Sequence, residues 1–382
     1  MHRANGRIRV LHMVENLDNQ AVETWLLRVF RVAARDYPDY QWTFFCVLRK
    51  PGRFDDEARS LGAEVIHSDY EIGDKRRFLL GLREVMKRGR YDVLHCHHDI
   101  MSAAYLAASA GLPFRKRIVH VHNTELGLPT PSRLKAGLAR EPMRQTCLRM
   151  ADQIVGISNE ALQSLIGTGT SDPLRHQVVH YAVDTARFVS DQPNREQLLH
   201  SLQLEPSRKI LLFVGRLVDY KNPCFVVDVL EQLNNLGQEF VALFAGKGDQ
   251  EERILASAKA LGLEDRVRLL GFRDDIPELM RSADLLIWPS LEDPKEGLGL
   301  GIVEAQAAGL PILMSQSVPG EAIVVSELVK VFPLAAGANL WARAAVELLR
   351  RPRPAFAESR ARVESSSFSM AQGVANLMAL YG

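Results

Sequence analysis

The feature that most constrains the fold is an alternation of two hydrophobic patterns that begins at residue 8 and continues through most of the chain. Short apolar runs rich in β-branched residues have the length of buried strands, and the longer segments between them have the 3.6-residue period of amphipathic helices. This alternation is typical of a parallel sheet with helices on both faces. The sequence therefore predicts an α/β protein built from doubly wound, Rossmann-like sheets.

The alternation occurs twice, with a polar stretch around residues 190–195 between the two series. The first series predicts strands at residues 8–14, 42–48, 64–67, 92–96, 117–122, 153–157 and 178–180, with helices that include residues 22–35, 77–88 and 132–150. The second series predicts strands at residues 210–215, 240–245, 267–270, 285–288, 311–314 and 328–332. We expect one domain over residues 1–190, a second over residues 191–366, and a C-terminal helix within residues 367–382. Since open α/β sheets bind ligands at the carboxyl ends of their strands, we expect the substrate cleft between the two halves.

Composition narrows the class of protein and its compartment. The 382 residues fit two domains better than one core, and 47 basic against 46 acidic residues leave no net field that would attract nucleic acid. The four cysteines show neither CxxC nor metal-ligand spacing, which favours a reducing compartment. No apolar run reaches 18 residues and the N-terminus has no signal-peptide core. We expect a cytoplasmic protein, one able to work at the inner face of the membrane, with no nucleic-acid partner.

A glycine-rich segment at residues 289–311 is the strongest functional signal. Glu296 and Glu304 stand on either side of an expected helix start. Unsatisfied N–H groups and the positive end of the helix dipole make such a start an anion site, here formed by the amides of Gly297, Leu298, Gly299 and Leu300. Eight helical residues would separate the two carboxylates by about 12 Å, which suits the ribose and hexose of a nucleotide sugar. The same strand, glycine turn and helix also occur in α/β domains that bind nothing.

Two cations strengthen the functional interpretation. Arg216 and Lys221 follow the predicted strand at 210–215. A leaving nucleoside diphosphate gains negative charge as the glycosidic bond breaks, and fixed cations stabilise that charge without a metal. Taken singly, these residues would be ordinary solvated charges. Their order along the chain with the two glutamates favours a diphosphate site.

The motif Glu-x7-Glu before Ala-x-Ala-Ala-Gly-Leu-Pro resembles that of the family-4 retaining glycosyltransferases of the GT-B fold. The resemblance covers nearly the whole chain and is nearest to transferases of exopolysaccharide or capsule assembly. It implies two Rossmann-like domains facing a central cleft, with the C-terminal helix crossing back to the first domain. It also implies that Arg216 and Lys221 bind the diphosphate, that Glu304 accepts hydrogen bonds from the ribose, and that Glu296 holds the transferred sugar. The nucleobase would then lie beside Phe272, Arg273 and Ile276.

The first half carries the acceptor side and one catalytic candidate. His122 matches the position of the family's active-site histidine, and strand alternation places His120 on the same face. In a retaining transfer the leaving phosphate takes the acceptor's proton, so a histidine or its backbone carbonyl can position the sugar and support the cationic transition state. A single histidine at a strand end is more often structural. The residues expected on the acceptor side are Gln20, Ala21, His97 and Asn123.

A cluster of histidines first suggests a metal. His95, His97, His98 and Asp99 lie within five residues, but side chains on one strand end cannot all converge on one ion. The resembled family has a similar His-x-His here without metal. We therefore expect no metal and no cofactor, the nucleotide sugar being a co-substrate.

The chain departs from the family pattern at three places. Gln20-Ala21 replaces a Gly-Gly pair, which fills the space beside the acceptor with side chains, and Tyr181-Ala182 replaces an Asn-Gly pair. Three extra residues before Glu296 leave Glu292 as an alternative, and we choose Glu296 because Gly297 follows it directly. The basic, partly apolar helix at 132–150 is similar to surfaces that peripheral transferases lay on anionic membranes, although a plain solvated helix fits equally well.

We predict a metal-independent retaining glycosyltransferase that moves a sugar from a nucleotide diphosphate sugar, expected to be a UDP-sugar, to a hydroxyl of a glycan or lipid-linked saccharide. One alternative is a nucleotide-sugar epimerase of the same fold, which would need no acceptor. Another is an inactive accessory subunit of a glycosyltransferase, favoured by the missing Gly-Gly pair. Pocket shape decides the sugar and the acceptor, and the sequence does not identify either.

Overall fold

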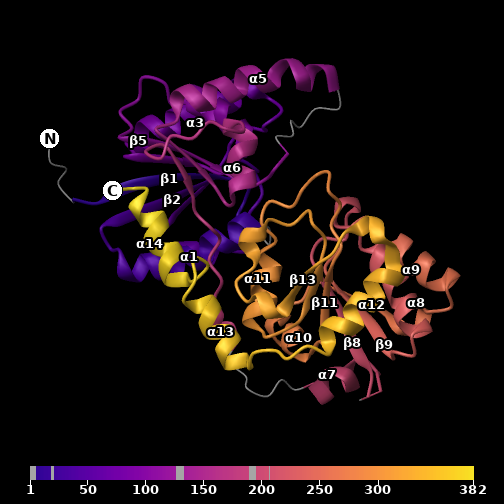
Figure 1. The fold of residues 1–382 in the computed structure, drawn as a ribbon. Helices are drawn as coiled ribbons and strands as arrows, with labels where there is room; N and C mark the ends of the chain where they lie inside the picture. The colour runs from indigo at the N-terminus through magenta and orange to yellow at the C-terminus, as the bar shows by residue number, and fades with distance from the viewer. Residues whose placement is uncertain (1–5, 19–20, 126–132, 189–194, 206) are drawn as a thin grey trace. The chain divides into compact units, whose positions relative to one another are not determined.

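The computed structural model describes residues 6–18, 21–125, 133–188, 195–205 and 207–382. The chain divides into two compact units (Figure 1): the first is Met1–Ala182 with Met370–Gly382, and the second is Val183–Ser369. The boundary after Ala182 precedes the expected one at residue 190. Val183 joins the second unit because its N–H donates to the Phe368 carbonyl at 2.8 Å.

The first unit contains a seven-stranded sheet whose neighbouring strands are all parallel. Its strands are β1 (Ile8–Val14), β2 (Tyr40–Cys46), β3 (Glu64–His67), β4 (Val93–Cys96), β5 (Lys116–Val121), β6 (Gln153–Gly156) and β7 (His176–Val178). Their order is β3-β2-β1-β4-β5-β6-β7. The strand order reverses between β1 and β4, and the carboxyl ends of these two strands form the switch point at which open α/β sheets bind ligands.

Helices cover both faces of this sheet (Figure 1). They are α1 (Ala21–Asp36), α2 (Asp55–Ser60), α3 (Lys75–Gly89), α4 (Ser102–Ala108), α5 (Arg133–Met150), α6 (Asn159–Ile166) and α14 (Met370–Ala379). α1 buries Trp25, Leu26, Val29 and Phe30, a spacing of three to four residues that makes one apolar stripe. α14 packs against α1, while α4 packs against both α3 and α5.

The second unit repeats the plan with six strands. These are β8 (Lys209–Val214), β9 (Phe240–Ala245), β10 (Val267–Gly271), β11 (Leu285–Trp288), β12 (Ile312–Met314) and β13 (Val329–Val331). All pairs are parallel, and the order β10-β9-β8-β11-β12-β13 places the switch point between β8 and β11.

The helices of the second unit are α7 (Arg195–Ser201), α8 (Cys224–Asn235), α9 (Glu251–Ala260), α10 (Ile276–Ser282), α11 (Leu300–Ala307), α12 (Gly337–Leu349) and α13 (Phe356–Glu364). The sheet forms an apolar core with α8, α9 and α12, in which Trp341 is fully buried. α11 packs against α10 and α13 as a separate helical layer. No helix of the described residues is long and apolar enough to cross a bilayer.

The predicted α/β class with two Rossmann-like sheets is confirmed. Every strand begins and ends within two residues of its predicted bounds, and the largest shifts are those of β2, which begins at Tyr40 rather than 42, and β7, which begins at His176 rather than 178. Hydrophobic periodicity reports buried side chains, whereas a strand is defined by its backbone ladder, so the two need not end together.

Candidate functional site

Two of the residues predicted to bind the donor, Lys221 and Glu296, meet at the switch point of the second unit. Arg216 and Lys221 follow β8, Glu296 follows β11, and Glu304 lies on α11. β8 and β11 are neighbouring parallel strands, so their carboxyl ends lie at the same edge of the sheet. The loops that follow them meet there, although Lys221 and Glu296 are 75 residues apart in the chain.

Lys221 and Glu296 form a buried ion pair at this edge. The Lys221 Nζ lies 2.5 Å from Glu296 Oε1, and their side chains are only 11% and 6% exposed. The same oxygen accepts from Ser290 Oγ at 2.5 Å and from Trp288 Nε1 at 3.2 Å. Trp288 also lies under the ammonium, whose nitrogen is 4.6 Å from a ring centroid. Because burying two charges is costly, this set of donors on one carboxylate oxygen marks a site built around charge.

The helix begins later in the chain than the sequence predicted. α11 begins at Leu300, and Gly299 is its N-cap with a φ of +79°. Glu296 therefore precedes the helix, and the predicted run of eight helical residues between the two glutamates is wrong. The positive φ is the reason for glycine here, and an added Cβ would also approach Val318 Cγ1 to 3.1 Å. As the N-cap residue, Gly299 has no side chain with which to cap the helix start.

Glycines allow the loops after neighbouring strands to touch. Gly246, which follows β9, has a φ of +150°, and a Cβ there would lie 1.8 Å from the carbonyl oxygen of Gly215 after β8. At Gly248 a Cβ would lie 2.1 Å from the Leu217 carbonyl oxygen. Close backbone contact is thus the reason for glycine at both positions.

The residues predicted beside the nucleobase follow β10. The ring of Phe272 is 67% exposed, with Lys247 Nζ 5.7 Å from its centroid. Arg273 is held by Asp275 through two contacts of 2.7 and 2.5 Å, and Ile276 begins α10. An exposed aromatic ring at a strand end offers a surface on which a base can stack. Arg216 is also exposed, and its Nη2 donates to Tyr220 Oη at 2.9 Å.

In the first unit, the predicted catalytic residue His122 is buried. Its Nε2 lies 3.2 Å from His97 Nδ1, and its Nδ1 lies 2.6 Å from Tyr181 Oη. Burial, reinforced by neighbouring histidines, holds the pKa of His122 well below its usual range. The imidazole is therefore neutral with both nitrogens engaged. His97, predicted on the acceptor side, is 3% exposed and equally occupied, since its Nε2 lies 3.1 Å from His12 Nδ1.

Asp99 organises the end of β5, a role that the sequence did not reveal. One carboxylate oxygen accepts the His122 backbone N–H at 2.6 Å, and the other accepts from Asn123 Nδ2 at 2.7 Å. Burial raises the pKa of Asp99 to about 6 although these contacts favour its charged form. Asp99 thus holds two adjacent predicted residues, His122 and Asn123, in place at the end of β5. Of the remaining acceptor-side pair, Ala21 is exposed at the start of α1, and Gln20 lies outside the described residues.

The His-rich segment at 95–99 does not converge on one point. His98 Nδ1 lies 2.8 Å from Tyr105 Oη, and Asp99 is engaged as above. Two other groups of imidazoles are close enough to consider a metal: His12, His95 and His97, and His97, His120 and His122. Within each group one nitrogen per residue lies within 4.8 Å of the others. His97 belongs to both groups, and its two nitrogens already face other rings.

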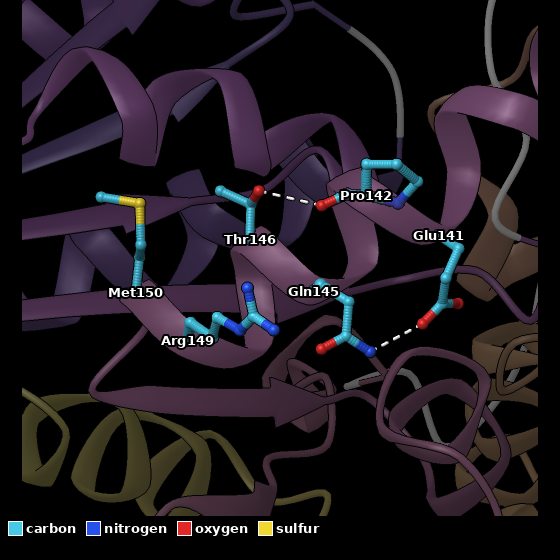
Figure 2. Close-up of a pocket in the computed structure, with 6 residues that line it drawn as sticks. All are labelled: Glu141, Pro142, Gln145, Thr146, Arg149 and Met150. Carbon is cyan, nitrogen blue, oxygen red and sulfur yellow. Dashed lines mark hydrogen bonds between the residues drawn. The ribbon is translucent and has the colours of Figure 1, made fainter.

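A surface hollow of about 530 Å³ lies along α5 (Figure 2). It is lined by Glu141, Pro142, Gln145, Thr146, Arg149 and Met150. All six belong to one helix and none is a predicted site residue. Thr146 Oγ1 donates to the Pro142 carbonyl and Gln145 Nε2 to Glu141 Oε1, so these side chains serve contacts within the helix. The hollow is not the site of the predicted chemistry.

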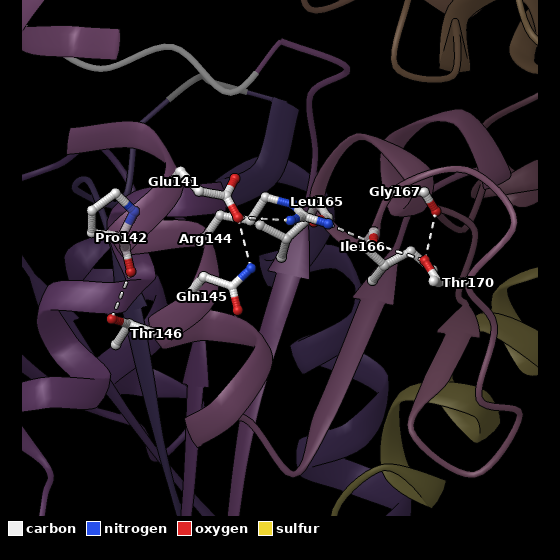
Figure 3. A network of polar contacts seen from close by, with 9 residues as sticks. All are labelled: Glu141, Pro142, Arg144, Gln145, Thr146, Leu165, Ile166, Gly167 and Thr170. Atoms are coloured by element: carbon white, nitrogen blue, oxygen red, sulfur yellow. Dashed lines mark hydrogen bonds and ion pairs between the residues drawn. The ribbon is translucent and has the colours of Figure 1, made fainter. Parts of the chain in front are cut away.

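Arg144, one of the cations of the basic helix α5, has a structural role (Figure 3). Its Nε and Nη2 donate to the carbonyls of Leu165 and Ile166 at 2.7 Å, and its Nη1 to Glu141 at 3.1 Å. Carbonyls at the end of a helix lack intrahelical partners. Arg144 thereby caps the C-terminus of α6 and is unavailable to an outside ligand.

Two family models match the chain. The model described as Glycosyltransferase Family 4 matches residues 10–187, and the model described as Glycosyl transferases group 1 matches residues 194–365. The chain belongs to the group 1 glycosyltransferases. The family and the enzyme class predicted from the sequence are thus confirmed. In this glycosyltransferase the first model covers the histidines of β4 and β5, and the second covers Lys221, Glu296 and Glu304.

Individual relatives extend over most of this glycosyltransferase. The putative glycosyltransferase EpsF of Bacillus subtilis is 26% identical over 378 residues, which are 98% of this chain and 96% of that protein. The UDP-Gal:alpha-D-GlcNAc-diphosphoundecaprenol alpha-1,3-galactosyltransferase of Escherichia coli is 24% identical over 339 residues, 86% and 84% of the two chains. The structure of HepE from Anabaena in complex with UDP and glucose has a TM-score of 0.76 at 18% identity, covering 98% of this chain and 99% of HepE. It confirms the GT-B fold.

Proposed function

We propose that this glycosyltransferase transfers a sugar, with retention of configuration and without a metal, from a UDP-sugar to a hydroxyl of a glycan or lipid-linked saccharide. The buried pair of Lys221 and Glu296 beside a helix start whose N-cap residue is glycine is the observation that carries the proposal. The names of two similar proteins support it: HepE was solved with UDP and glucose, and the E. coli relative takes UDP-Gal and a diphosphoundecaprenol-linked acceptor.

The diphosphate is assigned to the switch point of the second unit. Arg216 and Lys221 supply positive charge, and the amides of Gly297, Leu298, Gly299 and Leu300 supply N–H donors. Lys221 is already held by Glu296 and by the Trp288 ring, so its charge needs little reorganisation when phosphate arrives. Preorganised charge of this kind stabilises a leaving nucleoside diphosphate, and this is why we propose no metal.

The sugar and the nucleoside are assigned to opposite ends of this site. All three contacts of Glu296 use Oε1, and we assign its Oε2 to the hydroxyls of the transferred sugar. Glu304 is assigned to the ribose, and exposed Phe272, with Arg273 and Ile276, to the base. We assign His122 to positioning the transferred sugar through its backbone, because both of its ring nitrogens are engaged.

We also propose that α5 contacts anionic membrane lipids. Arg140 and Arg149 are exposed, and Leu138 is 72% exposed, so cations accompany an apolar side chain on the described part of the helix. Arg144 has no part in this contact because it caps α6. Co-sedimentation with vesicles containing phosphatidylglycerol should fall for the double variant Arg140→Gln/Arg149→Gln. Equal sedimentation of variant and wild type would refute the contact.

The donor site is tested by calorimetric titration of UDP, GDP and ADP and their common sugars. We expect one nucleotide to bind selectively and Glu304→Gln to weaken it about tenfold or more, since hydrogen bonds to charged groups contribute about 1.5–3 kcal/mol. Glu327→Gln makes the same change at an exposed glutamate of the same unit and should leave affinity unaltered. Failure of every nucleotide to bind, or equal affinity for Glu304→Gln and wild type, would count against the site.

A further inference from the structure

Five buried histidines and two tyrosines of the first unit form one continuous hydrogen-bonded chain. None of the seven side chains belongs to a residue more than 5% exposed. They come from β1, β4 and β5, from the segments that follow β4, β5 and β7, and from the C-terminal end beyond α14. In order along the chain of contacts they are Tyr181, His122, His97, His12, Tyr381, His95 and His120.

Each contact joins one nitrogen to one partner. From Tyr181 Oη the successive separations are 2.6 Å to His122, 3.2 Å to His97, 3.1 Å to His12, 3.5 Å to Tyr381, 2.9 Å to His95 and 3.3 Å to His120. His120 Nε2 ends the chain and has no hydrogen-bond partner among the described residues. No nitrogen is used twice, so the contacts form a line rather than a shell around one point.

The orientation of the rings is the same at every step. In each histidine Nδ1 faces the Tyr181 end and Nε2 faces the His120 end. A neutral imidazole carries one N–H and one bare nitrogen, so a ring that accepts on one side must donate on the other. All five histidines must therefore share one tautomer, either Nε2–H throughout or Nδ1–H throughout.

The two ends of the chain decide between these states. With Nε2–H throughout, Tyr181 donates to His122 Nδ1, and the only unpaired group is the N–H of His120, whose ring packs T-shaped against Trp25. With Nδ1–H throughout, both the Tyr181 hydroxyl hydrogen and the bare His120 Nε2 lack partners among the described residues. Unpaired buried polar groups are costly, so the first state is favoured.

We propose that Tyr181 and Tyr381 are positioning residues that hold all five histidines as neutral Nε2–H tautomers and thereby fix His122 at the end of β5 for sugar transfer. Tyr181 starts the chain, and Tyr381, 369 residues from His12, connects its two halves. The role in transfer rests on the proposed function, whereas the tautomers do not. The lowered pKa values of the histidines agree with neutral rings.

Nitrogen-15 NMR of histidine-labelled protein tests the tautomers without any assay of activity. Two-bond correlation spectra distinguish a protonated ring nitrogen from a bare one. We expect the Nε2–H pattern for all five histidines from pH 7 to pH 8. Mixed or Nδ1–H signals in the wild type would overturn the proposal. So would a change in the His97 signals on adding one equivalent of Zn²⁺, since it would reveal a metal site in place of the chain.

Variants then test the role of Tyr181. In Tyr181→Phe, His122 loses its donor. The Nε2–H state and the Nδ1–H state then each leave two unpaired groups, so neither is favoured and we expect both tautomers at His122. Tyr105→Phe is the matched control, because it removes a buried Tyr–His contact outside the chain, from Tyr105 to His98. Retention of a pure Nε2–H signal in Tyr181→Phe would overturn the proposal. If Tyr181→Phe does not fold, the wild-type spectrum still decides the tautomers.

Turnover provides the second readout. We expect Tyr181→Phe to lower kcat about tenfold to a hundredfold with KM for the nucleotide sugar nearly unchanged, and Tyr105→Phe to stay within about twofold of wild type. A loss confined to KM, or an equal loss in both variants, would contradict a positioning role. A wild type that transfers no sugar yet shows the expected tautomers would refute the proposed function but not the assignment of the tautomers.

Discussion

The first unit should be selectively sensitive to mild acid because burial strongly lowers the pKa of six of its histidines. The pKa falls to about 3 for His12 and His120, to about 4 for His98, and well below its usual range for His95, His97 and His122. A lowered histidine pKa means that the unfolded chain binds protons which the folded chain does not. The stability that these residues contribute is therefore present above about pH 6.5 and is lost as pH falls toward 3.

The size of the effect follows from proton linkage. At pH 5.5, one unit below the ordinary histidine pKa, each residue costs about 1.4 kcal/mol, so moving from pH 7 to 5.5 costs about 7 kcal/mol for six. Two carboxyls act in the opposite direction, because burial raises the pKa of Glu23 to about 7 and of Asp99 to about 6. Their stabilising contribution is fully present at low pH and lost as pH rises through these values. They return about 2 kcal/mol, leaving a net loss of about 5 kcal/mol from a typical stability of about 5–15 kcal/mol.

Pulsed hydrogen exchange at pH 7 after incubation at pH 7 or 5.5 measures this loss segment by segment. We expect β1, β4 and β5 to lose protection at pH 5.5 while β8, β9 and β11 keep it. The second unit is the internal control, since its single histidine, His200, is exposed. Equal loss of protection in both units, or full protection of β4 and β5 at pH 5.5, would refute the reasoning.

Three further predictions concern the second unit. Lys221→Met should destabilise the second unit by about 3–5 kcal/mol in urea unfolding, because Glu296 remains buried without its cation. Adding Glu296→Gln should restore much of the loss. Additive losses would contradict the pairing. Gly246→Ala should lower the stability by about 3 kcal/mol or more in thermal melting, because its Cβ would overlap the Gly215 carbonyl. Gly262→Ala, which has open space around it, should lower the stability by only about 1–2 kcal/mol. Equal losses would refute the close contact. Phe272→Ala should weaken nucleotide binding about tenfold in calorimetry without lowering stability, since the ring is 67% exposed; unchanged affinity would remove Phe272 from the base site.

The sequence was sufficient for the fold because the signals that define it are local. Each strand and helix is marked by its own period, and the repeated order implies two doubly wound sheets. Lys221 and Glu296 could be assigned to one site although 75 residues separate them, because their order along the chain resembles that of the family. Their direct ion pair was not predicted, since both had been assigned to a ligand rather than to each other.

The rest of the site depends on contacts that leave no local pattern. Alternation places His120 and His122 on one face. Nothing near either residue indicates that the chain of contacts between them passes through His12 and Tyr381, which are 369 residues apart in the sequence. The replacement of an Asn-Gly pair by Tyr181-Ala182 stood out in the sequence, yet only the structure connects Tyr181 to His122. Arg144 shows the reverse case, because its place among basic residues suggested a surface charge and its contacts make it a helix cap.

Sugar transfer by the purified protein tests the central claim most directly. The donor is the UDP-sugar selected by calorimetry, the acceptors are undecaprenyl-diphosphate-linked saccharides, and the readouts are UDP release and the mass and anomeric configuration of the product. We expect one UDP to be released per saccharide extended, only when acceptor is present, with retained configuration and an undiminished rate in EDTA. Conversion of the donor sugar without acceptor, or tight donor binding with no transfer to any of these acceptors, would contradict this expectation.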